Sequence, residues 1–408
     1  MKKWLALGVS LVLAMAMLAG CGDTSTPTDG TTDPATTGNS AEKEKIVRVT
    51  VSGTPVVDPA RGLYTSSAQA LPNIYDTLVF PVENSEEMKP WLAESWEISE
   101  DGTQYTFKLR EDVKFHNGDP LTASDVKFSM DRFLTIGEGF AYLFADVVDS
   151  TEVVDDYTVK FTLKHAYGPF LKILPRFWVL NEEQVMANIN PDGAYGEYGD
   201  YGTDWLITHD AGSGPYVVKE LVQQGHLYCE QFTDWWGGEW DANAPEAFKL
   251  IDNTEATTVR TMMSSKELEI SDMWQSSENL KAMDNLDGVE IALYSPLTKQ
   301  DLFLNTKREP FDDVNVRKAM ACLIDYDMVI NQLYPGSPVA TSPVPVYVSG
   351  HVDNVWPYTY DVEAAKGFLA QSKYANNIGD YTIEFICNSD VADHEKVALA
   401  IQSAAQQI

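Results

Sequence analysis

The stretch PWLAESWEISEDGTQYTFKLREDVKFHNGDPLTASDVKFSMDRF, residues 90–133, places a hairpin, a turn and a capped helix in immediate succession. Apolar and polar residues alternate from Glu94 to Arg110 around an Asp-Gly pair, which predicts two antiparallel strands joined by a tight turn. Thr122 is followed three positions later by Asp125, a spacing typical of a capping box, so we expect a helix to begin there. This stretch therefore predicts a fold that mixes helices and strands.

The same two periodicities continue on both sides of this block. Alternation predicts strands over residues 45–51 and 156–164, and residues 73–80 are expected to contain the end of a helix and the start of a strand. Helical spacing predicts two further helices, which begin at Asp313 and Asp325. The order of elements indicates an α/β or α+β protein with several lobes.

The C-terminal residues predict a strand and then a helix. Residues 381–388, YTIEFICN, alternate as a strand, and residues 394–408 follow a helical pattern. A strand and a crossover helix are normally followed by a parallel neighbouring strand. Since none follows, either the helix packs on elements already formed or the sequence is a fragment, and we favour the fragment.

The N-terminus has the features of an export signal. Lys2 and Lys3 precede an apolar run that is shorter than the roughly 20 residues a membrane span needs, so we expect residues 1–20 to be a secretory signal peptide. The order Leu-Ala-Gly-Cys21 resembles a bacterial lipobox, which implies cleavage before Cys21 and lipidation of its thiol. A chance cysteine after an ordinary signal is the alternative. Residues 21–40 lack large apolar side chains and predict a flexible tether.

Composition excludes some partners and favours others. The net charge of −32 argues against nucleic acid, whose phosphates would be repelled, and against adsorption to anionic lipid. Apart from Cys21, the chain contains only Cys229, Cys322 and Cys387, which allow one disulfide at most. We expect three free thiols, mostly buried.

Motifs of catalysis and cofactor binding are missing from the sequence. It contains no HExxH, GxSxG, Walker A or CxxC pattern, so we predict neither an enzyme nor a cofactor or metal site. His116 lies in a turn, where we expect local hydrogen bonds. Residues 188–193, NINPDG, resemble the front of a calcium loop, but the twelfth position is Gly199 where an EF-hand has glutamate, so a plain turn is favoured over calcium.

Several longer motifs, in order, resemble one protein family. The block at 90–133, GSGPYVVKEL at 212–221, FTDWWGG at 232–238, LFLNTKREPFDDVNVRKAMACLID at 302–325 and SPVPVYV at 342–348 are similar to signature segments of the family 5 extracellular solute-binding proteins. This group includes oligopeptide- and dipeptide-binding proteins. The resemblance covers roughly residues 46–408, and several long motifs in register are far more specific than one short pattern.

The resemblance implies a fold and its domains. It implies an α/β, two-lobed clamp of the class II periplasmic-binding-protein type with an extra subdomain. Domain Ia would hold residues 41–76 and 203–297, domain Ib residues 77–202, and lobe II residues 298–408. Lobe II would be incomplete, because the C-terminal return of the chain to the first lobe is missing.

The resemblance also implies a function. Such proteins capture peptides in the interlobe cleft and deliver them to an ABC permease and its ATPase subunits, and we expect a monomer, lipid-anchored at the outer face of the cytoplasmic membrane. The cleft-lining segments correspond to Thr65, Ser66, Ser67, Phe140, Tyr142 and Trp274, although a polar loop and packed aromatic residues would give the same pattern. Nickel chelates, oligosaccharides or opines are alternative ligands, and a ligand-sensing receptor or a surface hydrolase are alternative functions.

Overall fold

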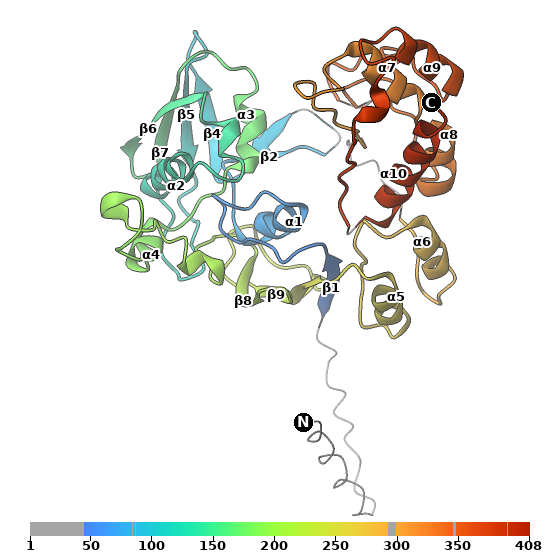
Figure 1. Cartoon of the computed structure of the whole chain (residues 1–408). Coiled ribbons are helices and arrows are strands. Elements are labelled where there is room, and N and C mark those ends of the chain that lie inside the picture. The colour runs from blue at the N-terminus through green and yellow to red at the C-terminus, as the bar shows by residue number, and fades with distance from the viewer. Residues whose placement is uncertain (1–44, 84, 86, 293–298, 346–347, 390) are drawn as a thin grey trace, which may run out of the picture. The chain divides into compact units, whose positions relative to one another are not determined.

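The computed structural model describes residues 45–83, 85, 87–292, 299–345, 348–389 and 391–408 (Figure 1). The predicted signal peptide, the tether and Cys21 lie outside these residues. Within the same ranges, every helix is too short or too polar to traverse a lipid bilayer.

The first sheet joins the start of the chain to its middle. Its strand order is β1 (Ile46–Val51), β10 (Ala247–Asp252), β9 (His226–Gln231) and β8 (Tyr216–Val222). β1 pairs with β10 in parallel, with Ile46 opposite Ala247, whereas the other pairs are antiparallel. The strand predicted over residues 45–51 is therefore confirmed, and its partner lies far away in the sequence.

The predicted hairpin forms the edge of a second, antiparallel sheet. The strand order is β4 (Ala93–Ile98), β5 (Gln104–Leu109), β7 (Thr158–Leu163) and β6 (Val148–Asp155). Tyr105, Phe107 and Leu109 of β5 are buried, as the alternation predicts. Two short strands, β2 (Val79–Pro81) and β3 (Met88–Pro90), pair separately.

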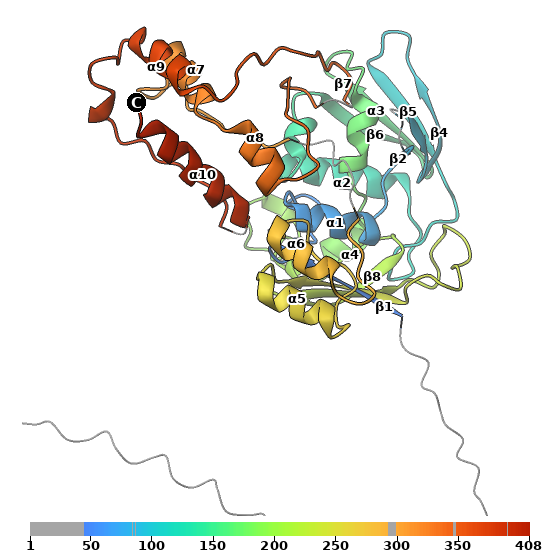
Figure 2. The ribbon, with the colours of Figure 1, turned by 90° about the vertical axis from the view of Figure 1, so that its right-hand side faces the viewer.

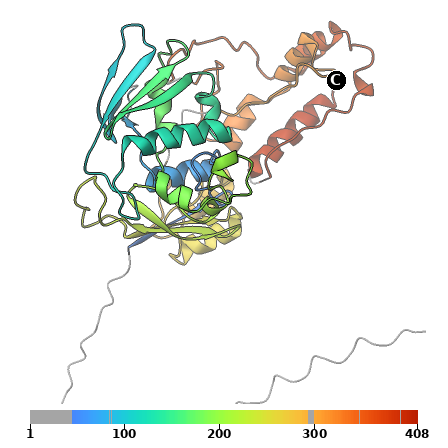
Figure 3. The same cartoon turned by 90° about the vertical axis from the view of Figure 1, so that its left-hand side faces the viewer.

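Helix α2 (Ala123–Ile136) covers one face of the second sheet and packs against β6 and β7 (Figure 3). The predicted cap is confirmed, because the Asp125 carboxylate accepts hydrogen bonds from the backbone N–H (2.8 Å) and the hydroxyl (2.9 Å) of Thr122. The helix ends at Gly137, whose φ of +69° is a left-handed conformation that glycine adopts without strain. Val126, Met130 and Phe133 enter the core of this sheet.

The remaining helices of this part of the chain are shorter. α1 (Thr65–Ile74) lies on the first sheet and packs against β8. The others are α3 (Phe170–Ile173), α4 (Glu182–Ala187), α5 (Ala256–Ser264) and α6 (Ser277–Asp284). The core beneath α1 also includes residues from the segment that connects β7 to β8. These residues are Trp178, Leu180, Val185 and Tyr201.

Among the described residues after 313, the α-helices are α7 (Val314–Cys322), α8 (Tyr326–Met328), α9 (Val362–Ala370) and α10 (Ala392–Ala405) (Figure 2). α7 packs against α9. The predicted starts of α7 and α8 are confirmed, because the side chain of Asp313 accepts from the N–H of Asn315 and that of Asp325 from the N–H of Met328. The predicted C-terminal helix is confirmed as α10.

The strand predicted for this region is wrong. Residues 381–388 form no strand, and none of the three sheets in the described ranges includes them. Alternation alone does not make a strand, because the backbone must also find a neighbouring strand to accept its hydrogen bonds. The expectation of three free thiols, mostly buried, is confirmed: Cys229 and Cys322 are buried and Cys387, in this same segment, is exposed.

Candidate ligand-binding site

A pocket lies where the end of β1, the first turn of α1 and the segment before α6 meet. Its lining residues are Thr50, Val51, Ser52, Thr65, Ser66, Gln69, Asp272, Met273 and Trp274. Hydroxyls, an amide and an indole provide both hydrogen-bonding groups and an apolar surface. Its free volume is only about 10 Å³, room for about one water molecule, so in this state its residues can contact one group of a ligand but do not enclose a whole ligand.

One wall of the pocket is built on the edge of β1 that faces away from β10. On this edge Val49 forms a single parallel bridge with Ile270. The N–H of Thr50 donates to the carbonyl of Ile270 (3.1 Å), and the N–H of Ile270 donates to that of Arg48 (3.0 Å). These bonds bring Asp272 and the residues after it to the end of β1.

Asp272 fixes the segment that carries Trp274. The Thr50 hydroxyl (3.1 Å) and the Gln275 amide (2.6 Å) both donate to its Oδ2, and the backbone N–H of Trp274 donates to its Oδ1 (2.9 Å). Burial raises the pKa of Asp272, and these three donors oppose that shift by favouring the carboxylate. Asp272 is thus a buried acceptor that joins the 272–275 segment to the end of β1.

The opposite wall is the first turn of α1. Thr65 is exposed and Ser66 is buried, and both line the pocket. The preceding residue, Tyr64, gives the helix no side-chain cap. The first-turn N–H groups of a helix have no partner within the helix, so this turn can donate hydrogen bonds to an acceptor in the pocket.

The six residues predicted to bind ligand fall into two groups. Thr65, Ser66 and Trp274 line the pocket together. Ser67 is fully buried, and its hydroxyl accepts the backbone N–H of Val56 (2.9 Å). The other two predicted residues, Phe140 and Tyr142, are absent from the pocket lining.

Phe140 and Tyr142 lie after the end of α2. Phe140 is partly buried and contacts the rings of Trp178 and Tyr142, with the Arg176 guanidinium 4.9 Å from its ring centre. Tyr142 is 66% exposed. The structure therefore does not bring these two residues together with the other predicted residues in one pocket.

Sequence reasoning missed most of the pocket lining. The missed polar residues are Thr50, Ser52, Gln69 and Asp272. Gln69 carries a recognisable signal, because it lies one helical turn after Thr65 on the same face of α1. Asp272 carries no such signal, since its importance depends on a contact with β1 more than 200 residues away.

The prediction of local hydrogen bonds for His116 is wrong. One ring nitrogen, Nδ1, faces the carboxylate of Asp210 at very short range, and Nε2 lies 2.9 Å from the carbonyl oxygen of Gly214. Burial alone would lower the pKa of His116, but the Asp210 carboxylate and the Gly214 carbonyl outweigh it, so the pKa is raised. His116 therefore ties its turn to a distant segment as a buried cation.

The NINPDG segment folds as part of a compact turn. The Asp200 carboxylate accepts hydrogen bonds from the backbone N–H groups of Asn190 (2.7 Å), Gly202 (2.9 Å) and Asp204 (2.8 Å). In the ranges that the structure describes, no cluster of three or more His, Cys, Asp or Glu side chains has the arrangement of a metal site. The Asp200 carboxylate is thus engaged by three backbone amides.

Comparison with known proteins shows which protein family the chain is related to. The sequence profile of the bacterial extracellular solute-binding proteins, family 5 Middle, matches residues 87–408. Heme-binding protein A from Haemophilus influenzae is 26% identical over 97% of this chain and 74% of its own length. The probable D,D-dipeptide-binding periplasmic protein DdpA from Escherichia coli is 28% identical over 80% of this chain, which spans only 60% of that relative.

The structure resembles solved periplasmic binding proteins. The ABC transporter-associated periplasmic binding protein DppA from Helicobacter pylori, in complex with peptide STSA, superposes with a TM-score of 0.72. The match is 24% identical and covers 89% of this chain and 72% of that one. At this level of identity the likeness establishes the fold, which is the α/β fold of the two-lobed periplasmic binding proteins. Because the profile match spans most of its residues, the chain belongs to the bacterial extracellular solute-binding proteins of family 5.

Proposed function

We propose that this protein is a lipid-anchored extracellular solute-binding protein that captures peptides and delivers them to an ABC permease. The observation that carries the proposal is the pocket in which Thr65, Ser66 and Trp274 meet the end of β1. These are three of the residues that the family resemblance assigns to ligand binding. Their convergence from segments far apart in the sequence is what a ligand site requires.

The groups that line the pocket suit one part of a peptide, because its volume of about 10 Å³ is too small for a whole peptide. The uncapped first turn of α1 offers N–H donors to a carbonyl or carboxylate oxygen, and the indole of Trp274 offers an apolar surface to a side chain. Main-chain hydrogen bonds give affinity without strict dependence on sequence. A relative that binds D,D-dipeptides and a neighbour that holds the peptide STSA support this ligand class.

The remaining parts of the proposal concern the rest of the binding cycle. Domain Ia (41–76 and 203–297), domain Ib (77–202) and lobe II (298–408) would close around the peptide, because the closed state makes more contacts with it. Phe140 and Tyr142 would approach the ligand only in that state. Lipid on Cys21 would hold a monomeric protein beside its permease at the outer face of the membrane. Since the protein binds and releases its ligand unchanged, we propose no enzymatic activity.

A thermal-shift and calorimetry experiment on the full chain tests the ligand class. The probes are the peptide Ser-Thr-Ser-Ala, D-alanyl-D-alanine, a nickel–histidine complex, heme and a mixture of oligosaccharides. A ligand that binds the folded state raises its apparent stability by RT ln(1 + [L]/Kd), so a peptide should raise the melting temperature. A shift with nickel, heme or sugars alone would replace the peptide assignment.

A variant test places the ligand in the pocket. Trp274→Ala should weaken peptide binding, whereas Trp205→Ala, which removes a tryptophan outside the pocket lining, should leave it unchanged. Equal loss of affinity in both variants would show that the effect is not local to the pocket. Mass spectrometry of the protein from membranes would test the lipid on Cys21.

A further inference from the structure

The loop between β1 and α1 connects the two walls of the pocket. β1 ends at Val51 and contributes Thr50 to Ser52, and α1 begins at Thr65 and contributes Thr65, Ser66 and Gln69. The course of residues 53–64 therefore sets where the first turn of α1 stands relative to the end of β1. The contacts that fix this loop therefore also fix the width of the pocket.

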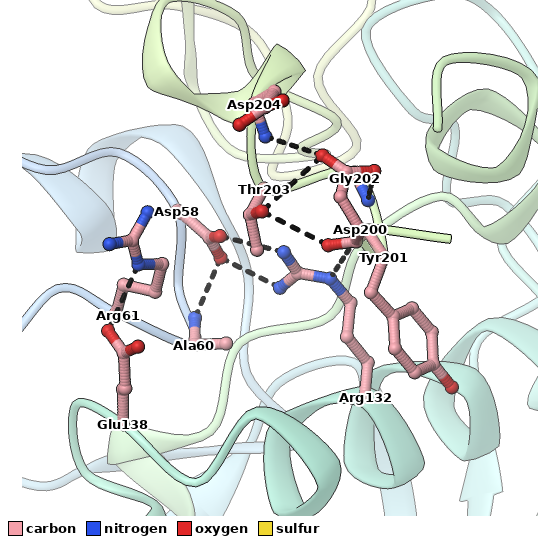
Figure 4. A network of polar contacts seen from close by, with 10 residues as sticks. All are labelled: Asp58, Ala60, Arg61, Arg132, Glu138, Asp200, Tyr201, Gly202, Thr203 and Asp204. Carbon is pink, nitrogen blue, oxygen red and sulfur yellow. Dashed lines mark hydrogen bonds and ion pairs between the residues drawn. The ribbon is translucent and has the colours of Figure 1, made fainter. Parts of the chain in front are cut away.

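A buried ion pair holds the loop at its centre (Figure 4). Arg132, on α2, is fully buried, and its guanidinium donates to both carboxylate oxygens of Asp58 at 2.7 Å each. Such a fork-to-fork pair fixes direction as well as distance, because both planar groups must lie in one plane. α2 thus fixes the position and orientation of Asp58.

The other polar atoms of Arg132 and Asp58 form hydrogen bonds with the surrounding backbone. The Nε of Arg132 donates to the carbonyl of Tyr201 (2.8 Å), and Oδ1 of Asp58 also accepts the N–H of Ala60 (3.0 Å). The carbonyl of Asp58 accepts the N–H groups of Arg61 (3.0 Å) and Gly62 (2.9 Å). Asp58 therefore closes the turn at 58–62 and anchors it to α2 with the same side chain.

This turn is in tight contact with α1. A Cβ added at Gly62 would lie 2.8 Å from Cδ1 of Leu71 and 3.0 Å from the carbonyl oxygen of Val56, so a larger residue there would force these neighbours to move. The N–H of Val56 donates to the hydroxyl of Ser67, in the first turn of the helix. A shift at Asp58 would therefore move the helix turn that lines the pocket.

Stability alone is a weak reason for such a pair. The desolvation cost of two buried charges can exceed their attraction, and well-packed apolar residues often stabilise a protein as well or better. A fixed geometry is what the ion pair adds. We infer that Arg132 and Asp58 are positioning residues that hold the first turn of α1 at the spacing from β1 that ligand binding requires. This inference rests on the proposed function.

The test compares three variants of the full chain. Asp58→Asn combined with Arg132→Met removes both charges and keeps an acceptor for the N–H of Ala60. Arg132→Lys keeps the charge but loses the two-pronged geometry. Arg61→Gln is the matched control, because Arg61 and Glu138 form an exposed ion pair (3.0 Å) between the same loop and the residues that follow α2.

Hydrogen–deuterium exchange over residues 53–71 is measured beside the melting temperature and the calorimetric Kd for Ser-Thr-Ser-Ala. In the neutral pair we expect faster exchange in this segment and a Kd raised about tenfold or more, because a site must be held to within about 0.5 Å. We expect Arg132→Lys to give a smaller effect of the same kind. Arg61→Gln should match the wild type in all three measurements.

The outcomes separate the inference from the proposed function. Wild-type exchange over 53–71 in the neutral pair overturns the inference, as does wild-type affinity in a variant whose exchange is faster. If the neutral pair does not fold, Arg132→Lys decides: wild-type exchange and affinity overturn the inference, and losses in both support it. If the wild-type chain binds none of the probes, the proposed function fails, and exchange alone then decides whether the pair positions the loop.

Discussion

The buried His116 predicts a stability that depends on pH in a defined direction. The side chains of His116 and Asp210 are 5% and 4% exposed, and the second ring nitrogen faces a carbonyl oxygen that can only accept. Both ring nitrogens must therefore donate, which requires the imidazolium form. The folded state binds this proton more tightly than the unfolded state, as the raised pKa of His116 expresses.

The sign and the size of the effect follow from this arrangement. A raised pKa contributes stability that is fully present below the unfolded pKa of about 6.5 and is lost as pH rises through the folded value. His116→Gln removes the cation and at least one of two charge-assisted hydrogen bonds, each worth roughly 1.5–3 kcal/mol. We therefore expect His116→Gln to lower the free energy of unfolding by about 2–4 kcal/mol at pH 6. This is comparable to the cost of breaking a buried ion pair.

Urea unfolding of the wild type and the variant at pH 6 and pH 9 measures this effect. The difference in free energy of unfolding should be largest at pH 6 and smaller at pH 9, because stability contributed by a raised pKa falls as the pH rises above the unfolded value. His165→Gln, a change at an exposed histidine, should show neither the loss nor its pH dependence. A difference between wild type and His116→Gln that stays constant from pH 6 to pH 9 would refute the reasoning.

Other predictions concern the core, the pocket and the thiols. Phe107→Ala should lower the free energy of unfolding by about 3–5 kcal/mol, measured by denaturant titration, because Phe107 is completely buried in β5. Asp272→Ala should weaken peptide binding and destabilise the fold by roughly 3 kcal/mol, because it leaves three donors without their acceptor. Calorimetry and urea unfolding would measure these two losses, and intact affinity would contradict the role of Asp272 in holding the segment of Trp274 against β1. In the native protein a thiol reagent should label Cys387 rapidly and Cys229 only after unfolding, as peptide mass spectrometry would show; equal rates would contradict their different burial.

Local patterns in the sequence predicted the local structure well. The Asp-Gly turn and the alternation around Phe107 determine the hairpin within a few residues, and the cap between Thr122 and Asp125 depends on neighbours along the chain. These features need no information about the rest of the fold. Residues 381–388 show the limit of the method, because the same alternation occurs there without a neighbouring strand.

The site was only partly predictable for the same physical reason. Thr65, Ser66 and Trp274 were predicted from the resemblance to the family, because equivalent positions in a family occupy the same place in the fold. Asp272 and Asp58 act through partners that the chain reaches only after folding, at separations of 222 and 74 residues. A buried carboxylate in a loop has no sequence pattern that separates it from an exposed one. Such residues become recognisable only when the structure shows their partners.

The parallel pairing of β1 with β10 has a consequence for the order in which the molecule assembles. Ile46 meets Ala247, so β1 must wait through the synthesis of about 200 further residues before its partner exists. The antiparallel sheet β4–β7 has shorter loops to close and can form during that interval. β1 thus leaves the ribosome long before the strand that pairs with it. Until β10 has been made, the unpaired edge of β1 can bind chaperones or other unfolded chains.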